Sequence, residues 1–217
     1  MEQNGTERRA SLQPDDCSAW AKNERDREYH DERWCRPVHD DRELFAMLCL
    51  EGQQCGLSWS LILEREELMR KAFFDFDYNR LAALDEKDEA AILNAEGIIR
   101  NKAKVHSVVK NARAYLKVRQ EFGTFDRYIW SFTDGQVVMN HPKTFREIPA
   151  KSELSERVSR DLKKRGFSFV GPVITYSYLQ GIGVINDHLE NCQFKYEKTE
   201  TENQHSADGS GGGHGQK

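Results

Sequence analysis

Two cysteines and two histidines in this sequence are candidate ligands for a metal ion. His188 and Cys192 are four positions apart, so a helix would place both side chains on one face. Cys17 and His30 lie near the other end of the chain. Two thiolates and two imidazoles can close a tetrahedral Zn²⁺ shell with no open position for a reacting water. These residues therefore allow a structural zinc site that joins both ends of a domain, although the spacing alone also fits four unrelated side chains.

A carboxylate close to several aromatic residues is a second candidate site. Glu51 stands between two apolar stretches and is followed by a segment rich in amides and glycine. Aromatic rings can hold a flat cation by stacking and cation–π attraction, and a carboxylate adds charge and a hydrogen-bond acceptor. The aromatic candidates are Tyr29, Trp34 and Trp59. One interpretation is a pocket for a flat cation; the other makes both tryptophans core anchors and Glu51 a capping or surface residue.

A short basic turn between two helical patterns is a candidate anion-binding element. Gly166 is suited to end one helix in the left-handed conformation, and Pro172 is suited to begin the next. A helix start directs free N–H groups and a positive dipole toward an anion. The turn therefore predicts either contact with phosphate or an ordinary corner with solvated cations. The residues assigned to it are Lys163, Lys164, Arg165, Gly166, Phe167 and Gly171.

A second basic stretch lies upstream, in a chain whose formal net charge is −4. No acidic residue interrupts residues 100–119, and an uneven charge distribution of this kind favours contact with nucleic acid phosphates. A solvated helix face is the alternative. The cations are Arg100, Lys102, Lys104, Lys110, Arg113, Lys117 and Arg119.

The elements that must position these residues are predicted to be helices. Apolar residues recur at helical spacing, and residues 135–139 are the best candidate for a strand. We therefore predict an all-α domain over residues 17–196, preceded by a disordered segment over 1–16 and followed by a flexible Gly/Ser-rich tail over 197–217. Predicted helices start at Asp40 or Asp41, at Ser58, near Glu89, near Arg100, at Phe125, at Ser152 and at Pro172.

Composition narrows the class of protein. No apolar run approaches the ~18 residues of a membrane span, and no signal peptide follows Met1. Five cysteines at irregular spacing indicate reduced thiols and an intracellular, cytoplasmic protein, which we expect to be a monomer with no membrane partner. Cys49 and Cys55 are expected in or near the core, and Cys35 receives no role.

Together these residues resemble the 3-methyladenine DNA glycosylase I family over about residues 17–192. The resemblance rests on four separated places: Leu50-Glu51-Gly52-Gln53-Gln54 with Gly56-Leu57-Ser58-Trp59; Gly97-Ile98-Ile99-Arg100-Asn101 with Asn111-Ala112-Arg113; Lys163-Lys164-Arg165-Gly166-Phe167 with Phe169-Val170-Gly171; and Asn186-Asp187-His188.

The resemblance implies a helix-hairpin-helix DNA glycosylase fold. It implies a monofunctional enzyme that flips 3-methyladenine out of alkylated double-stranded DNA, hydrolyses its N-glycosidic bond and releases the base. Residues 166–171 become the DNA-binding hairpin, and Leu57 is our candidate for a wedge beside the flipped base. Asp187 is not assigned a catalytic role. The implied zinc ligands are Cys17, His30, His188 and Cys192; the implied base-binding residues are Glu51, Tyr29, Trp34 and Trp59, with Glu51 and Tyr29 also placed at the catalytic centre.

The sequence departs from the family pattern in two places. Trp20 stands three residues after Cys17, where the family usually has two, and Arg33-Trp34-Cys35 replaces the usual Glu-Trp-Gly. An arginine pointing into a pocket for a cationic base would be unfavourable, so the substrate range could differ.

Two other functions remain open from the sequence. A DNA-binding module that has lost turnover would keep the hairpin and the metal, and failure to excise methylated adenine would support it. A zinc hydrolase would need an open coordination position, which four protein ligands do not leave.

Overall fold

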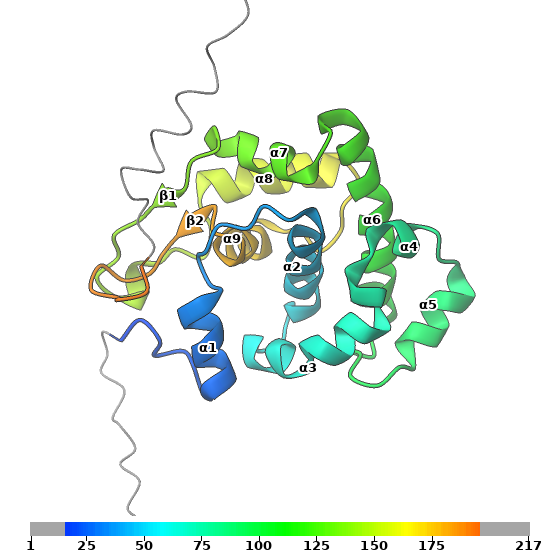
Figure 1. Cartoon of the computed structure of the whole chain (residues 1–217), viewed down its shortest axis with the longest axis horizontal. Coiled ribbons are helices and arrows are strands. Elements are labelled where there is room, and N and C mark those ends of the chain that lie inside the picture. The colour runs from blue at the N-terminus through cyan, green and yellow to red at the C-terminus, as the bar shows by residue number, and fades with distance from the viewer. Residues whose placement is uncertain (1–15, 196–217) are drawn as a thin grey trace, which may run out of the picture.

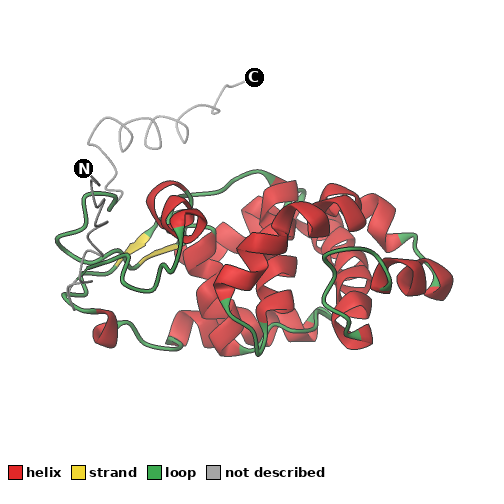
Figure 2. Ribbon diagram, turned by 90° about the horizontal axis from the view of Figure 1, so that it is seen from below, coloured by secondary structure: helices red, strands yellow, loops and turns green. Residues whose placement is uncertain are grey.

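The computed structural model describes residues 16–195, so the predicted disordered segment (except residue 16) and the predicted tail lie outside the described residues. Helices make up most of the fold (Figure 2), which confirms the predicted all-α architecture. The helices are α1 (Glu24–Glu32), α2 (Asp41–Gln54), α3 (Trp59–Ala72), α4 (Tyr78–Ala82), α5 (Glu86–Leu93), α6 (Lys102–Phe122), α7 (Phe125–Trp130), α8 (Glu153–Lys164) and α9 (Pro172–Gly181). Single 3₁₀ turns are η1 (Phe74–Phe76), η2 (Ser131–Thr133) and η3 (Phe145–Glu147).

A minimal parallel sheet accompanies the helices. Strand β1 (Val138–Met139) pairs in parallel with β2 (Ile185–Asn186), so the strand predicted over residues 135–139 is real but shorter. Within residues 16–195, no helix is both long and apolar enough to cross a membrane.

Side-chain caps start the helices where the sequence predicts them. The Asp40 carboxylate accepts hydrogen bonds from two backbone N–H groups of α2, and the Ser58 hydroxyl accepts one from Leu61 of α3. Ser152 and Ser155 form a reciprocal capping box at the start of α8. Pro172 stands at the first position of α9, as its fixed φ favours.

Helix α2 lies in the middle of the molecule and organises the core (Figure 1). Its residues from Leu44 to Gln53 are all buried, and it packs against α3, α6, α7 and α9. Helix α6 turns the predicted apolar face toward it, with Val105, Val108, Val109 and Ala112 buried. Because Glu51 lies on this central helix, its carboxyl group is carried into the interior.

Candidate functional site

Aromatic residues from separate parts of the chain surround a cavity of about 230 Å³. Helix α1 and the turn after it contribute Tyr29 and Trp34, α2 contributes Glu51, and Trp59 is the first residue of α3. The structure therefore brings together all four residues assigned to base binding. The remaining lining residues are Trp20, Gln54, Phe145, Ile148, Ser177 and Gln180.

Glu51 is the single acidic residue among those lining residues, and it is only 4% exposed. Burial raises the pKa of its carboxyl group to about 8, because the ionised form loses hydration. A cation in the cavity would favour the ionised carboxylate, so binding of the cation and ionisation of Glu51 are coupled. The alternative of Glu51 as a surface residue is thereby excluded.

The aromatic walls are set at angles to one another. The rings of Tyr29 and Trp59 are 5.2 Å apart at 58°, and Trp20 approaches Tyr29 edge-on at 6.2 Å. Trp34 stacks on Phe145 at 6.5 Å and 19°. The buried Nε1–H of Trp59 has no hydrogen-bond acceptor among residues 16–195. The cavity thus offers aromatic faces and one buried acid to a flat ligand.

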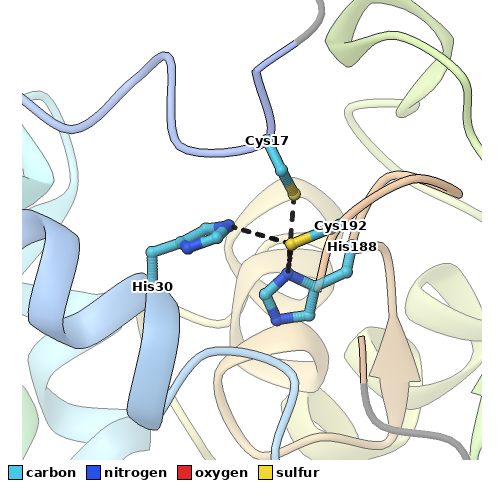
Figure 3. Close-up of side chains that lie close together, drawn as sticks. All are labelled: Cys17, His30, His188 and Cys192. Carbon is cyan, nitrogen blue, oxygen red and sulfur yellow. Dashed lines mark hydrogen bonds between the residues drawn. The ribbon is translucent and has the colours of Figure 1, made fainter. Parts of the chain in front are cut away.

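The four predicted metal ligands meet beside this cavity (Figure 3). Cys17 Sγ lies 3.5 Å from His188 Nδ1, and Cys192 Sγ lies 3.4 Å from the same nitrogen. The distance from Cys192 Sγ to His30 Nε2 is 4.0 Å, and the four ligand atoms all lie within 4.8 Å of one another. This group could therefore hold a metal ion.

Outer hydrogen bonds orient the ligand atoms toward the centre of the cluster. His30 Nδ1 lies 2.7 Å from the Asp31 carboxylate, which leaves Nε2 to face the cluster. The backbone carbonyl of Trp34 lies 3.1 Å from His188 Nε2, which leaves Nδ1 free to bind. Burial lowers the pKa of His188 to about 4, which keeps its imidazole neutral, as a metal ligand must be.

The cluster also supports the cavity wall. The Trp34 ring lies 5.7 Å from the His30 ring and 4.8 Å from the His188 ring. Tyr29 and His30 are neighbours on α1, so the cavity and the cluster share one helix. A metal ion that fixes the histidines would also fix Trp34.

The α8–α9 loop, residues 165–171, turns at Gly166 with a φ of 96°, which is favourable for glycine. Lys163 and Lys164 are exposed at the end of α8, next to this loop. Two other residues assigned to this turn have partners within the protein. Arg165 forms ion pairs with Glu121 and Asp161, and Phe167 is buried against Phe125. Phe167 therefore anchors the loop in the core, and Arg165 is held by two acidic side chains at the surface.

Fewer cations of the basic stretch on α6 are free to contact phosphate than its charge implies. Lys104 is only 5% exposed, and its ammonium donates to the carbonyls of Gln53 and Cys55 at the end of α2. Arg113 donates to the carbonyls of Ala82 and Leu84. Arg119 pairs with Asp41. The exposed members that remain are Arg100, Lys102, Lys110 and Lys117.

The two departures from the family pattern do not disturb the cavity. Arg33 points away from it and pairs with Glu66 of α3. Trp20 lines the cavity despite its shifted position. Cys35 takes the place of the usual glycine with a φ of 60°, and its buried sulfur accepts the Asp187 N–H.

Other residues complete the comparison with the sequence. Asp187 is buried and accepts hydrogen bonds from Tyr176, Gln180 and Asn140, and it does not itself line the cavity. Leu57 is half-buried in the turn before Trp59. Cys49 is buried as predicted, whereas Cys55 is exposed, contrary to prediction, because it ends α2 at the surface.

The sequence did not single out several cavity residues. Phe145 and Ile148 come from the η3 segment, and Ser177 and Gln180 come from α9. None belongs to a short motif, and the helical spacing of Ser177 and Gln180 alone indicates only a shared face.

The chain was compared with known proteins. Residues 20–196 match the model of a family described as methyladenine glycosylase. The DNA-3-methyladenine glycosylase of Haemophilus influenzae is 40% identical over 168 residues, covering 77% of this chain and 91% of that protein. DNA-3-methyladenine glycosylase 1 of Escherichia coli is 43% identical over 164 residues, covering 76% and 88%.

Solved structures of 3-methyladenine DNA glycosylases are also similar to this chain. The 3-methyladenine DNA glycosylase I of Staphylococcus aureus superposes with a TM-score of 0.83 at 31% identity, covering 86% of this chain and 99% of that chain. A 3-methyladenine DNA glycosylase I in complex with 3-methyladenine superposes with a TM-score of 0.82, also at 31% identity, covering 84% and 98%.

Proposed function

Because this chain belongs to the methyladenine glycosylase family, we propose that it excises 3-methyladenine from alkylated double-stranded DNA. The observation that carries this proposal is the buried carboxyl group of Glu51 in a cavity walled by Tyr29, Trp34 and Trp59. A methyl group on N3 gives the adenine of a nucleotide a positive charge. An acid among aromatic rings matches such a flat cation.

Recognition of the lesion follows from the charges in the cavity. The Glu51 carboxylate accepts a hydrogen bond from the amino edge of the base, while the rings of Trp34 and Trp59 stack around it. Normal adenine is neutral and gains no cation–π attraction, so it leaves Glu51 protonated at neutral pH because burial raises the pKa of this group to about 8. Selectivity therefore comes from charge in a desolvated site.

Hydrolysis needs little further assistance from the protein. The positive charge makes the methylated base a good leaving group once the nucleotide is flipped out of the duplex. Cleavage of the N-glycosidic bond leaves an oxocarbenium-like sugar, which water attacks, and the bonding electrons leave with the neutral base. Glu51 adds electrostatic stabilisation to this transition state, with Tyr29 beside it. Among residues 16–195, no lysine lines the cavity, and we propose a monofunctional hydrolase.

The α8–α9 loop serves as the hairpin of a helix-hairpin-helix element in this proposal. Lys163 and Lys164 contact DNA phosphate, and Gly166 and Gly171 allow the backbone to approach it. Leu57, in the turn that carries Trp59 into the cavity, acts as the wedge beside the flipped base. The substrate places the enzyme inside the cell, and a single copy supplies every residue named here.

A structural Zn²⁺ is the ion that we propose for the Cys17–His30–His188–Cys192 cluster. Tetrahedral zinc–sulfur and zinc–nitrogen bonds hold neighbouring ligand atoms about 3.5 Å apart. The separations of 3.4 and 3.5 Å from His188 Nδ1 match this spacing, and the 4.0 Å between Cys192 Sγ and His30 Nε2 is longer. Four protein ligands leave no position for a reacting water. The ion would tie residues near Cys17 to the segment after β2 and so hold Trp34 in place.

The experiment that tests the function is release of free 3-methyladenine from methylated duplex DNA by the purified chain. We expect release of the base with the abasic strand left uncut, because the enzyme is monofunctional. Tight binding of the duplex without release would refute the proposal and favour a DNA-binding module that lacks turnover. Strand cleavage at the abasic site would refute the monofunctional mechanism alone.

A further inference from the structure

Tyr29 separates the aromatic cavity from a second, polar depression on the outside of the molecule. It lines the 230 Å³ cavity together with Glu51 and Trp59. It also lines a depression of about 290 Å³ between α1 and α3, together with Arg33 and Glu66. Groups in the outer depression can therefore influence the cavity through one aromatic ring.

Arg33 covers the Tyr29 ring from the outer side. Its guanidinium carbon lies 5.2 Å from the ring centroid, within the range of a cation–π interaction. The guanidinium also donates two hydrogen bonds to Glu66, with Nη1–Oε2 and Nη2–Oε1 distances of 2.8 and 3.0 Å. This bidentate geometry is the strongest form of an arginine–carboxylate pair.

Glu66 is well placed to neutralise Arg33. Its side chain is 11% exposed, and it accepts a further hydrogen bond of 3.1 Å from Arg70 Nε. Burial by itself would raise the pKa of Glu66, but the hydrogen bonds and charge of Arg33 hold it below the usual value. Glu66 is thus ionised at neutral pH.

A second polar link between the same helices lies on the other side of Tyr29. Ser60 of α3 donates a hydrogen bond of 2.6 Å to the Asp26 carboxylate of α1. The Arg33–Glu66 pair lies about two helical turns further along α1. The two links flank Tyr29 and fix the helix that carries it against the helix that begins with Trp59.

The charge on Arg33 has an electrostatic consequence for the cavity. A cation against one side of an aromatic ring withdraws the electron density that attracts a cation on the other side. An arginine without a partner would therefore oppose a positively charged base, whereas an arginine paired with Glu66 would not. A neutral base is affected much less by either arrangement.

We propose that Glu66 determines affinity for the charged lesion by neutralising Arg33 behind Tyr29, while the ion pair holds Tyr29 against Trp59. This inference rests on the proposed function, because it takes the ligand to be a methylated adenine cation. It makes Arg33 and Glu66 positioning residues, neither of which touches the base.

The test compares a cationic with a neutral ligand by quenching of tryptophan fluorescence. The cation is 3,9-dimethyladeninium, whose charge is permanent, and the neutral ligand is free 3-methyladenine. Variants are Glu66→Gln, Arg33→Gln and the double variant. Glu96→Gln is the matched control, because it removes the same charge at an exposed position that lines neither the cavity nor the outer depression. Thermal unfolding of each variant checks that it is folded.

We expect Glu66→Gln to weaken binding of the cation by about fivefold and binding of the neutral base by less than about twofold. The double variant should restore binding of the cation, since removing Arg33 removes the uncompensated charge. Equal weakening for both ligands, or a double variant no better than Glu66→Gln, would show that the pair is only a structural brace. If the wild type binds neither ligand, the base site is wrong and the inference fails with it, whereas binding without excision would refute only the proposed function.

Discussion

Asn111 of α6 holds Ser168, in the middle of the α8–α9 loop, through both atoms of its amide group. Ser168 N donates to Asn111 Oδ1 at 2.8 Å, and Asn111 Nδ2 donates to the Ser168 carbonyl at 3.1 Å. The next residue, Phe169, has a φ of 55°, and a Cβ built on Gly52 would lie 3.4 Å from its Cβ. The loop is therefore fixed against α2 one residue from Glu51, which connects the proposed DNA contact with the base cavity.

Replacing Asn111 with alanine should loosen the loop and leave the cavity intact. We expect Asn111→Ala to weaken binding to undamaged duplex by about tenfold, because the loop that would contact the DNA backbone loses its fixed shape. Binding of free 3-methyladenine should stay within about twofold of wild type. Fluorescence anisotropy and tryptophan quenching measure the two affinities. Asn94→Ala is the control, since Asn94 is exposed at the end of α5. Equal loss of both affinities would show a general structural defect.

The two exposed lysines and the paired arginine beside the loop should behave differently. Loss of Lys163 and Lys164 should reduce the slope of log Kd against log salt concentration by about 2, because each phosphate contact contributes about 0.9. Arg165→Ala should leave that slope unchanged and lower the melting temperature, since its guanidinium pairs with Asp161 and Glu121. A reduced slope for Arg165→Ala would contradict our assignment.

Removal of the proposed zinc should destabilise the fold. We expect one zinc per chain in the purified protein, and its loss in Cys17→Ser should lower the free energy of unfolding by several kcal/mol. Metal analysis and denaturant unfolding measure the two effects. Cys55→Ser is the control, because that thiol is exposed and lies outside the cluster. Full metal content in Cys17→Ser would refute the ligand assignment.

The buried carboxyl group of Glu51 should make stability depend on pH. Its pKa is raised from 4.5 to about 8, so the folded state binds a proton that the unfolded state has lost. The free energy of unfolding should therefore fall by a few kcal/mol as the pH rises from about 4.5 to about 8. The difference between wild type and Glu51→Gln in urea unfolding isolates this effect. A difference that does not change with pH would contradict the burial of an ionisable acid.

Much of the fold and of the site was predictable, because interactions between residues close in the sequence determine where the helices begin. The caps at Asp40, Ser58 and Ser152 depend on a side chain and the backbone within three residues, so the sequence is sufficient to place them. The meeting of the four candidate metal ligands was predictable because few types of side chain bind metals. The family resemblance then singled out His188 and Cys192 from chance pairs.

The burial and direction of several side chains could not be predicted, because contacts with residues far away in the sequence determine them. In the sequence, Lys104 is one of several cations in a basic stretch. In the structure it is buried, because its ammonium group donates hydrogen bonds to the backbone carbonyls at the end of α2. The direction of Arg33 depends on Glu66, which lies on another helix. Phe145 reaches the cavity from a 3₁₀ turn that carries no motif.

The most direct test of the central claim is single-turnover excision by Glu51→Gln. Glutamine keeps the size and one acceptor of Glu51 but cannot carry its negative charge. We predict that release of 3-methyladenine falls at least about a hundredfold, while the affinity for undamaged duplex, which does not involve Glu51, stays within about threefold of wild type. Glu96→Gln, at an exposed position outside the cavity, should release the base at the wild-type rate. Wild-type release by Glu51→Gln would contradict the account, because the buried charge would then have no part in the reaction.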